Sequence, residues 1–113
     1  MRDDRERLRD IKAAIEKIEK YAARGRATFV TDELLQVWMV HFLRIIGEAC
    51  RAISEPFREQ HPEIPWRDII GFRNLLVHQY FGIDLDMVWD IVEKDLPVLK
   101  NHVESILAQM EKE

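Results

Sequence analysis

Hydrophobic side chains recur at intervals of three and four residues along most of the sequence, and this spacing predicts helices throughout. In the first predicted helix, residues 4–23, the spacing gives one apolar stripe of Leu8, Ile11, Ile15, Ile18 and Ala22. Asp3 or Asp4 can cap its start, and Gly25 is suited to its end. The sequence contains no alternating strand pattern and no internal repeat.

The second predicted helix, residues 32–59, is unusual because it is apolar on nearly every face. Thr31 is placed to act as its N-cap. Between residues 34 and 46 the only polar side chains are those of Gln36, His41 and Arg44. A helix that is apolar all round needs cover on more than one side, so we interpret the excess as a homodimerisation surface. The alternative is a central helix that is covered entirely by its own chain.

Three further helices are predicted over residues 66–78, 85–94 and 96–110. The prolines of segment 61–65 predict a loop before the first of them. Asp84 can cap the second, and Pro97 predicts a kink and restart before the third. The expected fold is therefore a single all-α domain over residues 1–113, an up-and-down bundle of four to five helices that dimerises.

The composition is that of an ordinary globular domain, with 47% hydrophobic and 34% charged residues. The net charge of −4 is unevenly spread, because residues 1–26 carry nine Lys/Arg against six acids whereas residues 81–113 carry three against eight. Any contact with nucleic acid would therefore need a local cationic patch. The apolar run is too short to span a bilayer and the N-terminus has no apolar signal core, so we expect a cytoplasmic protein without membrane contact.

Several kinds of site are excluded or unsupported. Cys50 is the sole cysteine, so neither an intrachain disulfide nor a multi-cysteine metal site can form. Its apolar surroundings predict a buried, inert thiol. The sequence has no glycine-rich phosphate loop, no paired-histidine zinc helix and no nucleophile elbow. We therefore expect no metal and no cofactor.

One stretch, residues 71–84, gathers side chains that can act on a phosphate group. Asn74 and His78 are four residues apart and share a helix face, so the amide can orient the imidazole. Arg73 precedes His78 by five residues, and its long side chain can bend toward a shared phosphate. Tyr80 follows, near the expected end of the helix. The spacing alone equally fits a capping histidine beside a surface arginine.

The amino-acid sequence of this stretch and of its neighbours resembles the HepT family, which belongs to the HEPN superfamily of small helical RNases. The matching segments are Ile45-Ile46-Gly47-Glu48-Ala49, Pro65-Trp66, Ile70-Gly71-Phe72-Arg73-Asn74, Val77-His78-Gln79-Tyr80-Phe81-Gly82-Ile83-Asp84, Val88-Trp89 and Asp95-Leu96-Pro97. The superfamily signature is an arginine, four to six residues, then a histidine, and HepT narrows it to Arg-x4-His-x-Tyr. Arg73, His78 and Tyr80 keep this motif intact, and the resemblance covers essentially the whole chain.

The resemblance implies the toxin of a type VII-like toxin–antitoxin pair, a metal-independent endoribonuclease that acts on cellular RNA such as tRNA or mRNA. It implies a homodimer with the active site at the dimer interface, and an MNT-type nucleotidyltransferase antitoxin as partner. The catalytic roles fall on Arg73 and His78, with Asn74 in support. Tyr80 would be the tyrosine to which the antitoxin attaches AMP.

Two other interpretations remain open at this stage. One is a non-catalytic helical dimer that binds a nucleotide or a protein and partners a nucleotidyltransferase. The other is a structural or antitoxin-side helical adaptor. RNA cleavage by the pure protein in EDTA would separate the RNase interpretation from both of these alternatives.

Aromatic and histidine side chains outside the motif have simpler interpretations. We predict core or interface positions for Trp38, Trp66 and Trp89. His41 is expected to be a packed, hydrogen-bonded histidine rather than a ligand.

Three charged residues of the second predicted helix have less certain roles. Glu48 lies within an apolar run, and because a buried acid needs a partner we expect it to support the site by pairing with Arg73 or Arg44. Arg44 and Arg51 either form surface ion pairs or line a groove for RNA.

Overall fold

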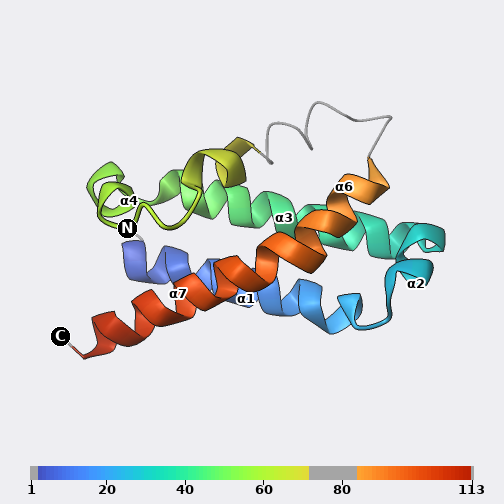
Figure 1. Ribbon diagram of the computed structural model, residues 1–113, viewed down its shortest axis with the longest axis horizontal. Helices are drawn as coiled ribbons and strands as arrows, with labels where there is room; N and C mark the ends of the chain where they lie inside the picture. Colours follow the sequence, from blue (N-terminus) through green and yellow to red (C-terminus); the bar gives the residue numbers. More distant parts are fainter. Residues whose placement is uncertain (1–2, 72–83, 113) are drawn as a thin grey trace.

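The computed structural model describes residues 3–71 and 84–112, and these are helical along most of their length (Figure 1). In chain order the elements are α1 (Asp4–Ala22), α2 (Arg26–Thr31), α3 (Glu33–Ala52), α4 (Glu55–Gln60), helical residues 66–71, α6 (Leu85–Asp90), the π-helical segment η1 (Ile91–Asp95) and α7 (Leu96–Glu111). No strand occurs within these described ranges. The predicted all-α, bundle-like fold is confirmed.

The first helix follows the sequence prediction closely. Asp3 caps α1, and its carboxylate accepts a hydrogen bond from the Glu6 N–H at 2.9 Å. After α1 the chain turns through Gly25, whose φ of 92° lies in the region that glycine adopts without steric cost. This turn leads into the six-residue helix α2, which the hydrophobic pattern does not predict.

The single helix predicted over residues 32–59 is wrong, because the structure divides it into α3 and α4. The break lies at Ile53, which has an extended backbone with ψ of 139°. Ser54 caps α4 and Pro56 occupies its first turn, where a missing N–H leaves no hydrogen bond unmade. The carboxylate of Asp4 accepts from the Ser54 N–H at 2.9 Å and from its hydroxyl at 2.7 Å, which ties the break to the start of α1.

The predicted N-cap at Thr31 is also wrong. Thr31 is the last residue of α2, and its hydroxyl donates back to the Ala27 and Thr28 carbonyls within that helix. Asp32 caps α3 instead, since its carboxylate accepts from the Leu35 N–H at 3.1 Å. Threonine and aspartate are both good N-caps. Asp32 caps α3 because Thr31 is taken up by α2, a helix that the sequence did not predict.

The helix does not stop and restart before Pro97 as predicted, because α6, η1 and α7 follow one another as consecutive helical segments with a locally wider turn. Asp84 caps α6 as predicted, accepting from the Met87 N–H at 3.1 Å. In η1 the Leu96 N–H donates to the Ile91 carbonyl, five residues back. The wider turn lets the chain reach Pro97, which has no N–H to give to a carbonyl four residues earlier, without breaking the helix.

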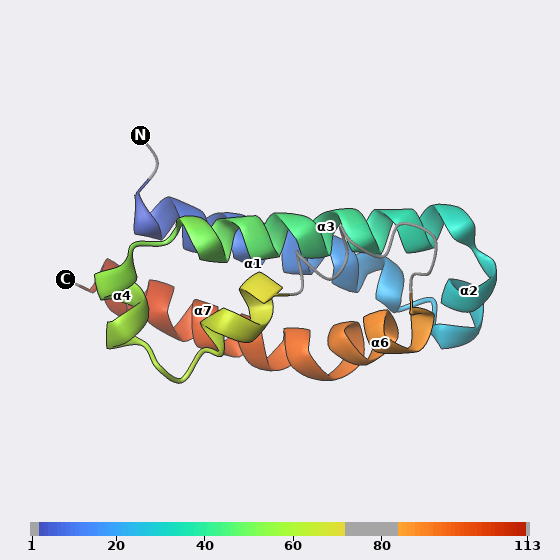
Figure 2. The same ribbon diagram turned by 90° about the horizontal axis from the view of Figure 1, so that it is seen from above.

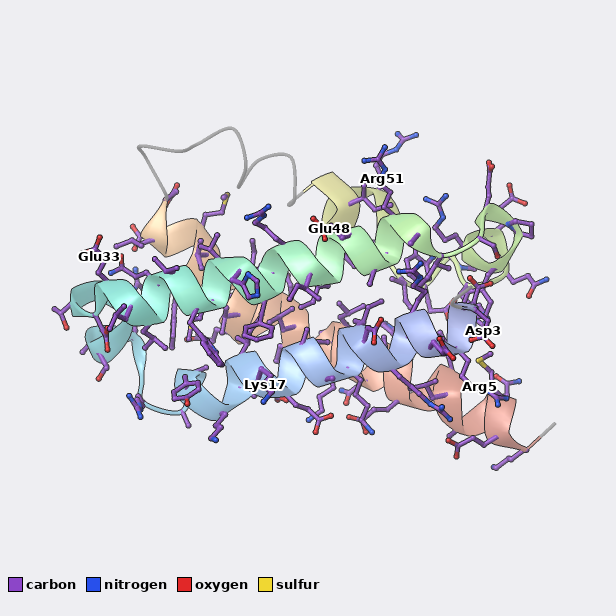
Figure 3. The ribbon with its side chains drawn as sticks, turned by 180° about the vertical axis from the view of Figure 1, so that it is seen from behind. Asp3, Arg5, Lys17, Glu33, Glu48 and Arg51 are labelled. Carbon is purple, nitrogen blue, oxygen red and sulfur yellow. The ribbon has the colours of Figure 1, made fainter. Side chains whose placement is uncertain are left out.

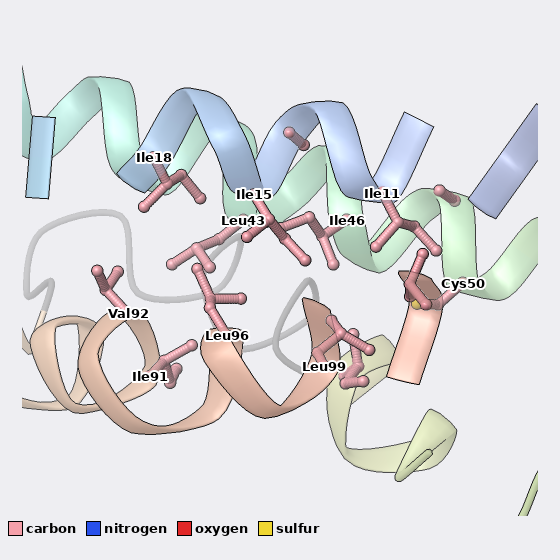
Figure 4. Packing of buried hydrophobic residues seen from close by; sticks show 14 of the residues in the cluster. Ile11, Ile15, Ile18, Leu43, Ile46, Cys50, Ile91, Val92, Leu96 and Leu99 are labelled. Atoms are coloured by element: carbon pink, nitrogen blue, oxygen red, sulfur yellow. The ribbon is translucent and has the colours of Figure 1, made fainter. Parts of the chain in front are cut away.

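The core forms where the three long helices meet. Helices α1 and α3 run antiparallel, and α7 packs against α1 along its length (Figures 1 and 2). Figure 4 shows the side chains that fill the space between them: Ile11, Ile15, Ile18, Leu43, Ile46, Cys50, Ile91, Val92, Leu96 and Leu99. All of these are buried, and no charged or polar residue is buried among the described residues.

Among the described residues, one stripe of α3 is fully buried, whereas other positions of the helix are half-buried or exposed. Residues 35, 39, 43, 46 and 50 are buried, whereas Leu34 and Val37 keep 83% and 58% of their surface exposed. The described residues do not cover these two positions, as a helix wrapped entirely by its own chain would require. The predicted dimer surface remains a prediction.

Replacing Ile15 by alanine tests the core directly. The side chain is fully buried between the long helices, so Ile15→Ala should lower the free energy of unfolding by about 2–5 kcal/mol. Lys17→Ala, on the exposed face of the same helix, should change it by less than about 0.5 kcal/mol. Urea unfolding followed by circular dichroism measures both, and equal effects would contradict the assigned core face.

Candidate functional site

The motif residues Arg73, Asn74, His78 and Tyr80 lie outside the described residues. Their positions therefore stay predictions from the sequence. The structure does describe the chain on either side of the motif and the neighbouring face of α3. These parts are the described surroundings of the motif in the chain.

Helical residues 66–71 lead into the motif and are fixed to the core. Ile64, Trp66 and Ile69 are buried. The Trp66 indole N–H donates to the His61 carbonyl at 2.9 Å, and the Ile69 N–H donates to the Pro65 carbonyl at 3.1 Å. In Figure 2 this segment lies between α3 and α7. The approach to Arg73 is thus anchored by side chains that cannot move without exposing apolar surface.

The chain that leaves the motif is anchored in the same way. Val88 and Trp89 of α6 are buried, and the Trp89 ring stacks on Phe29 of α2 with ring centroids 5.4 Å apart. Its indole N–H donates to the Glu93 carboxylate at 2.7 Å. Arg26 and Asp86 add an ion pair between α2 and α6. The predicted core positions of Trp66 and Trp89 are confirmed.

Glu48 is not the buried acid that the sequence suggested. It is exposed on α3, and Figure 3 shows it with Arg51 on the side of the helix that points away from α1. Glu48 lies within an apolar run, but the buried residues of that run, Ile46 and Ala49, lie on a different side of the helix. The prediction that Glu48 is buried is therefore wrong. Glu48 is nevertheless beside the segment that leads into the motif, since residues 66–71 lie along this half of α3 (Figures 1 and 2).

Arg44 and Arg51 are exposed on α3 as well. Neither forms an ion pair with another residue of the described ranges, so the surface ion pairs considered for them are not found there. Two exposed guanidinium groups without an ion-pair partner in the described ranges therefore stand on α3. This is the local cationic character that an acidic protein would need for contact with a polyanion.

His41 departs from its prediction, whereas Trp38 follows it in part. His41 is exposed, and its ring approaches the Phe42 ring edge-on with 5.0 Å between the ring centroids. Trp38 is half-buried between Tyr21, at 5.2 Å, and Phe42, at 4.8 Å. Its indole N–H is buried without an acceptor in the described structure.

The described ranges hold neither a metal-binding cluster nor a membrane span. No three His, Cys, Asp or Glu side chains of residues 3–71 and 84–112 converge as metal ligands would. None of the helices in these ranges combines the length and the apolar character that a bilayer crossing requires.

Cys50 is buried in the core, as predicted. Burial raises the pKa of its thiol to about 12, because a thiolate would lose its hydration, while the charge of Arg58 opposes this shift. A thiol that stays protonated at neutral pH is neither a nucleophile nor a metal ligand. Cys50 is therefore a packing residue.

The reactivity of Cys50 should report on this burial. At pH 8 we expect the native protein to react with Ellman's reagent at least about a hundredfold more slowly than the urea-unfolded chain. Because the folded pKa is raised, the stability contributed by the buried thiol is present below the pKa of the unfolded thiol and declines as pH rises above it. Equal labelling rates for the native and unfolded chains would contradict the assigned burial.

Known proteins resemble this chain over most of its length. The family model described as Ribonuclease HepT-like matches residues 11–106. A Thermococcus cleftensis protein named "Probable ribonuclease HepT" is 39% identical over 106 residues, which cover 93% of this chain and 96% of the relative. A candidate RNase of Methanocaldococcus jannaschii is 42% identical over 78 residues, covering 69% of this chain and 72% of its own. No solved structure matches the chain. The chain belongs to the HepT-like ribonuclease family.

Proposed function

We propose that this chain is the toxin of a toxin–antitoxin pair, an endoribonuclease that cleaves cellular RNA in the cytoplasm without a metal ion. The observation that carries the proposal is the intact motif Arg73-x4-His78-x-Tyr80 in a chain of the HepT-like ribonuclease family. The residues of this motif suit the chemistry of RNA cleavage.

Metal-free cleavage of RNA uses the 2′-hydroxyl as the nucleophile. This oxygen attacks the adjacent phosphorus, and the bond from phosphorus to the 5′-oxygen of the next nucleotide breaks. One group must accept the 2′-OH proton and another must protonate the departing 5′-oxygen. Histidine fits both roles because its ordinary pKa lies near neutrality. His78 is the histidine of the motif, so one chain supplies only one of the two groups.

A two-fold dimer resolves this shortage, because it brings a second His78 to the same site. One imidazole would act as base and the other as acid. Leu34 and Val37 on α3 support such a dimer, since large apolar side chains exposed on a helix are typical of a protein interface. In this account dimerisation is a requirement of catalysis.

Arg73 supplies the positive charge that the reaction needs. Its guanidinium is permanently protonated and can fork onto two phosphate oxygens, which stabilises the extra negative charge of the transition state. Asn74 would hold His78 in one tautomer. Glu48 would orient Arg73 from α3, and the exposed Arg44 and Arg51 would hold the RNA backbone.

Tyr80 would be the point of control. A nucleotidyltransferase antitoxin would transfer AMP from ATP to the phenol oxygen, with pyrophosphate as the leaving group. The added nucleotide brings bulk and negative charge to the place where an RNA phosphate must bind. Steric block and repulsion would then silence the RNase.

Cleavage of RNA by the pure protein in EDTA is the first test. Wild-type protein should cut RNA, and His78→Ala and Arg73→Ala should each lower the rate by about a hundredfold or more. His61→Ala and Arg67→Ala remove the same side-chain types outside the motif and should retain the wild-type rate. A 2′-deoxy nucleotide placed at a cleaved position should abolish cleavage there.

Two results would count against the enzyme. If wild-type protein and His78→Ala leave RNA equally intact, the chain is instead the non-catalytic binding module. If EDTA stops the cleavage and Mg²⁺ restores it, the two-histidine mechanism fails.

The control by Tyr80 has its own experiment. Incubation with the partner nucleotidyltransferase and ATP should add one adenylyl group per chain by intact mass and suppress RNA cleavage. Tyr80→Phe should block the mass increase. Tyr21→Phe, which alters the other tyrosine of the chain, should leave the mass increase in place. Modification of the Tyr80→Phe protein would assign the AMP to another residue.

A further inference from the structure

A cavity of about 200 Å³ opens between α3, the segment 65–69 and the junction of η1 with α7. Its inner wall is made of five buried aliphatic side chains: Leu43, Ile46, Ile69, Leu96 and Leu99. Four of them appear in the core view of Figure 4, where Leu43 and Ile46 face Leu96 and Leu99. The cavity is therefore a gap in the edge of the hydrophobic core, at the place where residues 66–71 meet α7.

Polar groups at the mouth of this cavity give it a negative charge. Asp68 and Asp95 line it and are exposed, and His102 beside them is half-buried. None of the three side chains forms a hydrogen bond or an ion pair with a residue of the described ranges. Asp95 even stands at the start of α7 without capping it. Two carboxylates that have no ion-pair partner in the described ranges, beside an apolar cavity, favour a cationic ligand.

The π-helical segment lies at this same place. Asp95 is the last residue of η1, and the following residue, Leu96, is part of the cavity wall. The wide turn thus presents an acid and an adjacent apolar side chain to one opening. Single π-helical turns occur often at functional sites, because they redirect side chains that a regular helix would place elsewhere.

The size of the cavity and its surroundings favour a polypeptide over a small molecule. Small-molecule sites usually enclose roughly 300–1,000 Å³, whereas this cavity suits one large apolar side chain. Pro65 and Val98 line the rim, and Val98 keeps 54% of its surface exposed. These apolar rim residues extend the contact beyond the cavity. A chain that crosses the mouth would cover them, and a compact amine inside the cavity would not.

We propose that this cavity docks a partner polypeptide that inserts one large apolar side chain and places Lys or Arg next to Asp68 and Asp95. The apolar side chain would contribute burial, and the flanking cations would meet the two carboxylates at the solvent boundary. This proposal does not depend on the proposed RNase function. The occupant of the cavity would nevertheless contact the chain at Asp68 and Ile69, a few residues before Arg73.

Two labelled peptides test the proposal by fluorescence anisotropy with the full chain. The first has the sequence GRLFKG and the second has the sequence GELFEG, both with a fluorescein label and an amidated end. GRLFKG should bind at least about tenfold more tightly, because only its charges complement the rim. In ¹⁵N spectra it should shift the amides of Leu43, Ile69 and Leu99 rather than those of α2.

Matched variants locate the binding. D68N/D95N should weaken GRLFKG about tenfold, and V98W, a change at an exposed position, should block the mouth without disturbing the core. E16Q/E33Q removes the same charge from exposed positions away from the cavity and should change binding by less than about twofold. Circular dichroism checks that each variant is folded.

Three results would overturn the proposal: no binding of GRLFKG, equal binding of both peptides, or equal binding of GRLFKG by wild type and D68N/D95N. Phenethylamine alone provides a further comparison. If it shifts the same amides with an affinity equal to that of GRLFKG, the occupant is a small amine and not a polypeptide. Because RNA cleavage is measured separately, failure here leaves the proposed RNase function unaffected.

Discussion

The burial of the α1 stripe against α3, closed by α7, is the contact on which the rest of the molecule depends. Ile11, Ile15 and Ile18 meet Leu43 and Ile46 in a space that contains no buried polar group among the described residues. Apolar burial of this kind is non-directional, so it fixes how close the helices lie more firmly than how each one ends. The ends are set by local capping contacts, such as those of Asp3, Ser54 and Asp84.

The core also positions the segments that flank the motif. Trp66 and Ile69 hold the approach on one side, and Val88 and Trp89 hold the exit on the other. Exposing any of these side chains would cost free energy in proportion to the apolar area released. Buried apolar side chains therefore hold the chain in place on either side of the sequence motif.

The long helices could be predicted from the sequence because each has enough turns to display a stripe. The six-residue α2 could not, because less than two turns give no periodicity. The break at Ile53 had a local signal in Ser54 and Pro56, which the strong apolar run before it obscured. The burial of single polar residues was predicted least well, since Glu48 and His41 are both exposed. Whether such a residue is buried depends on which neighbouring elements cover its face of the helix. The motif was identified from the resemblance of residues 73–80 to a known family. The spacing of these residues alone would not have predicted a catalytic role.

We propose that one chain holds half of an active site. The measurement that tests it most directly is the rate of RNA cleavage per chain across a range of protein concentrations, with the dimer fraction followed by sedimentation over the same range. If two chains build the site, the rate per chain should rise with the dimer fraction, and Val37→Asp, at an exposed apolar position of α3, should lower both together. A rate per chain that stays constant while dimers dissociate into monomers would contradict it.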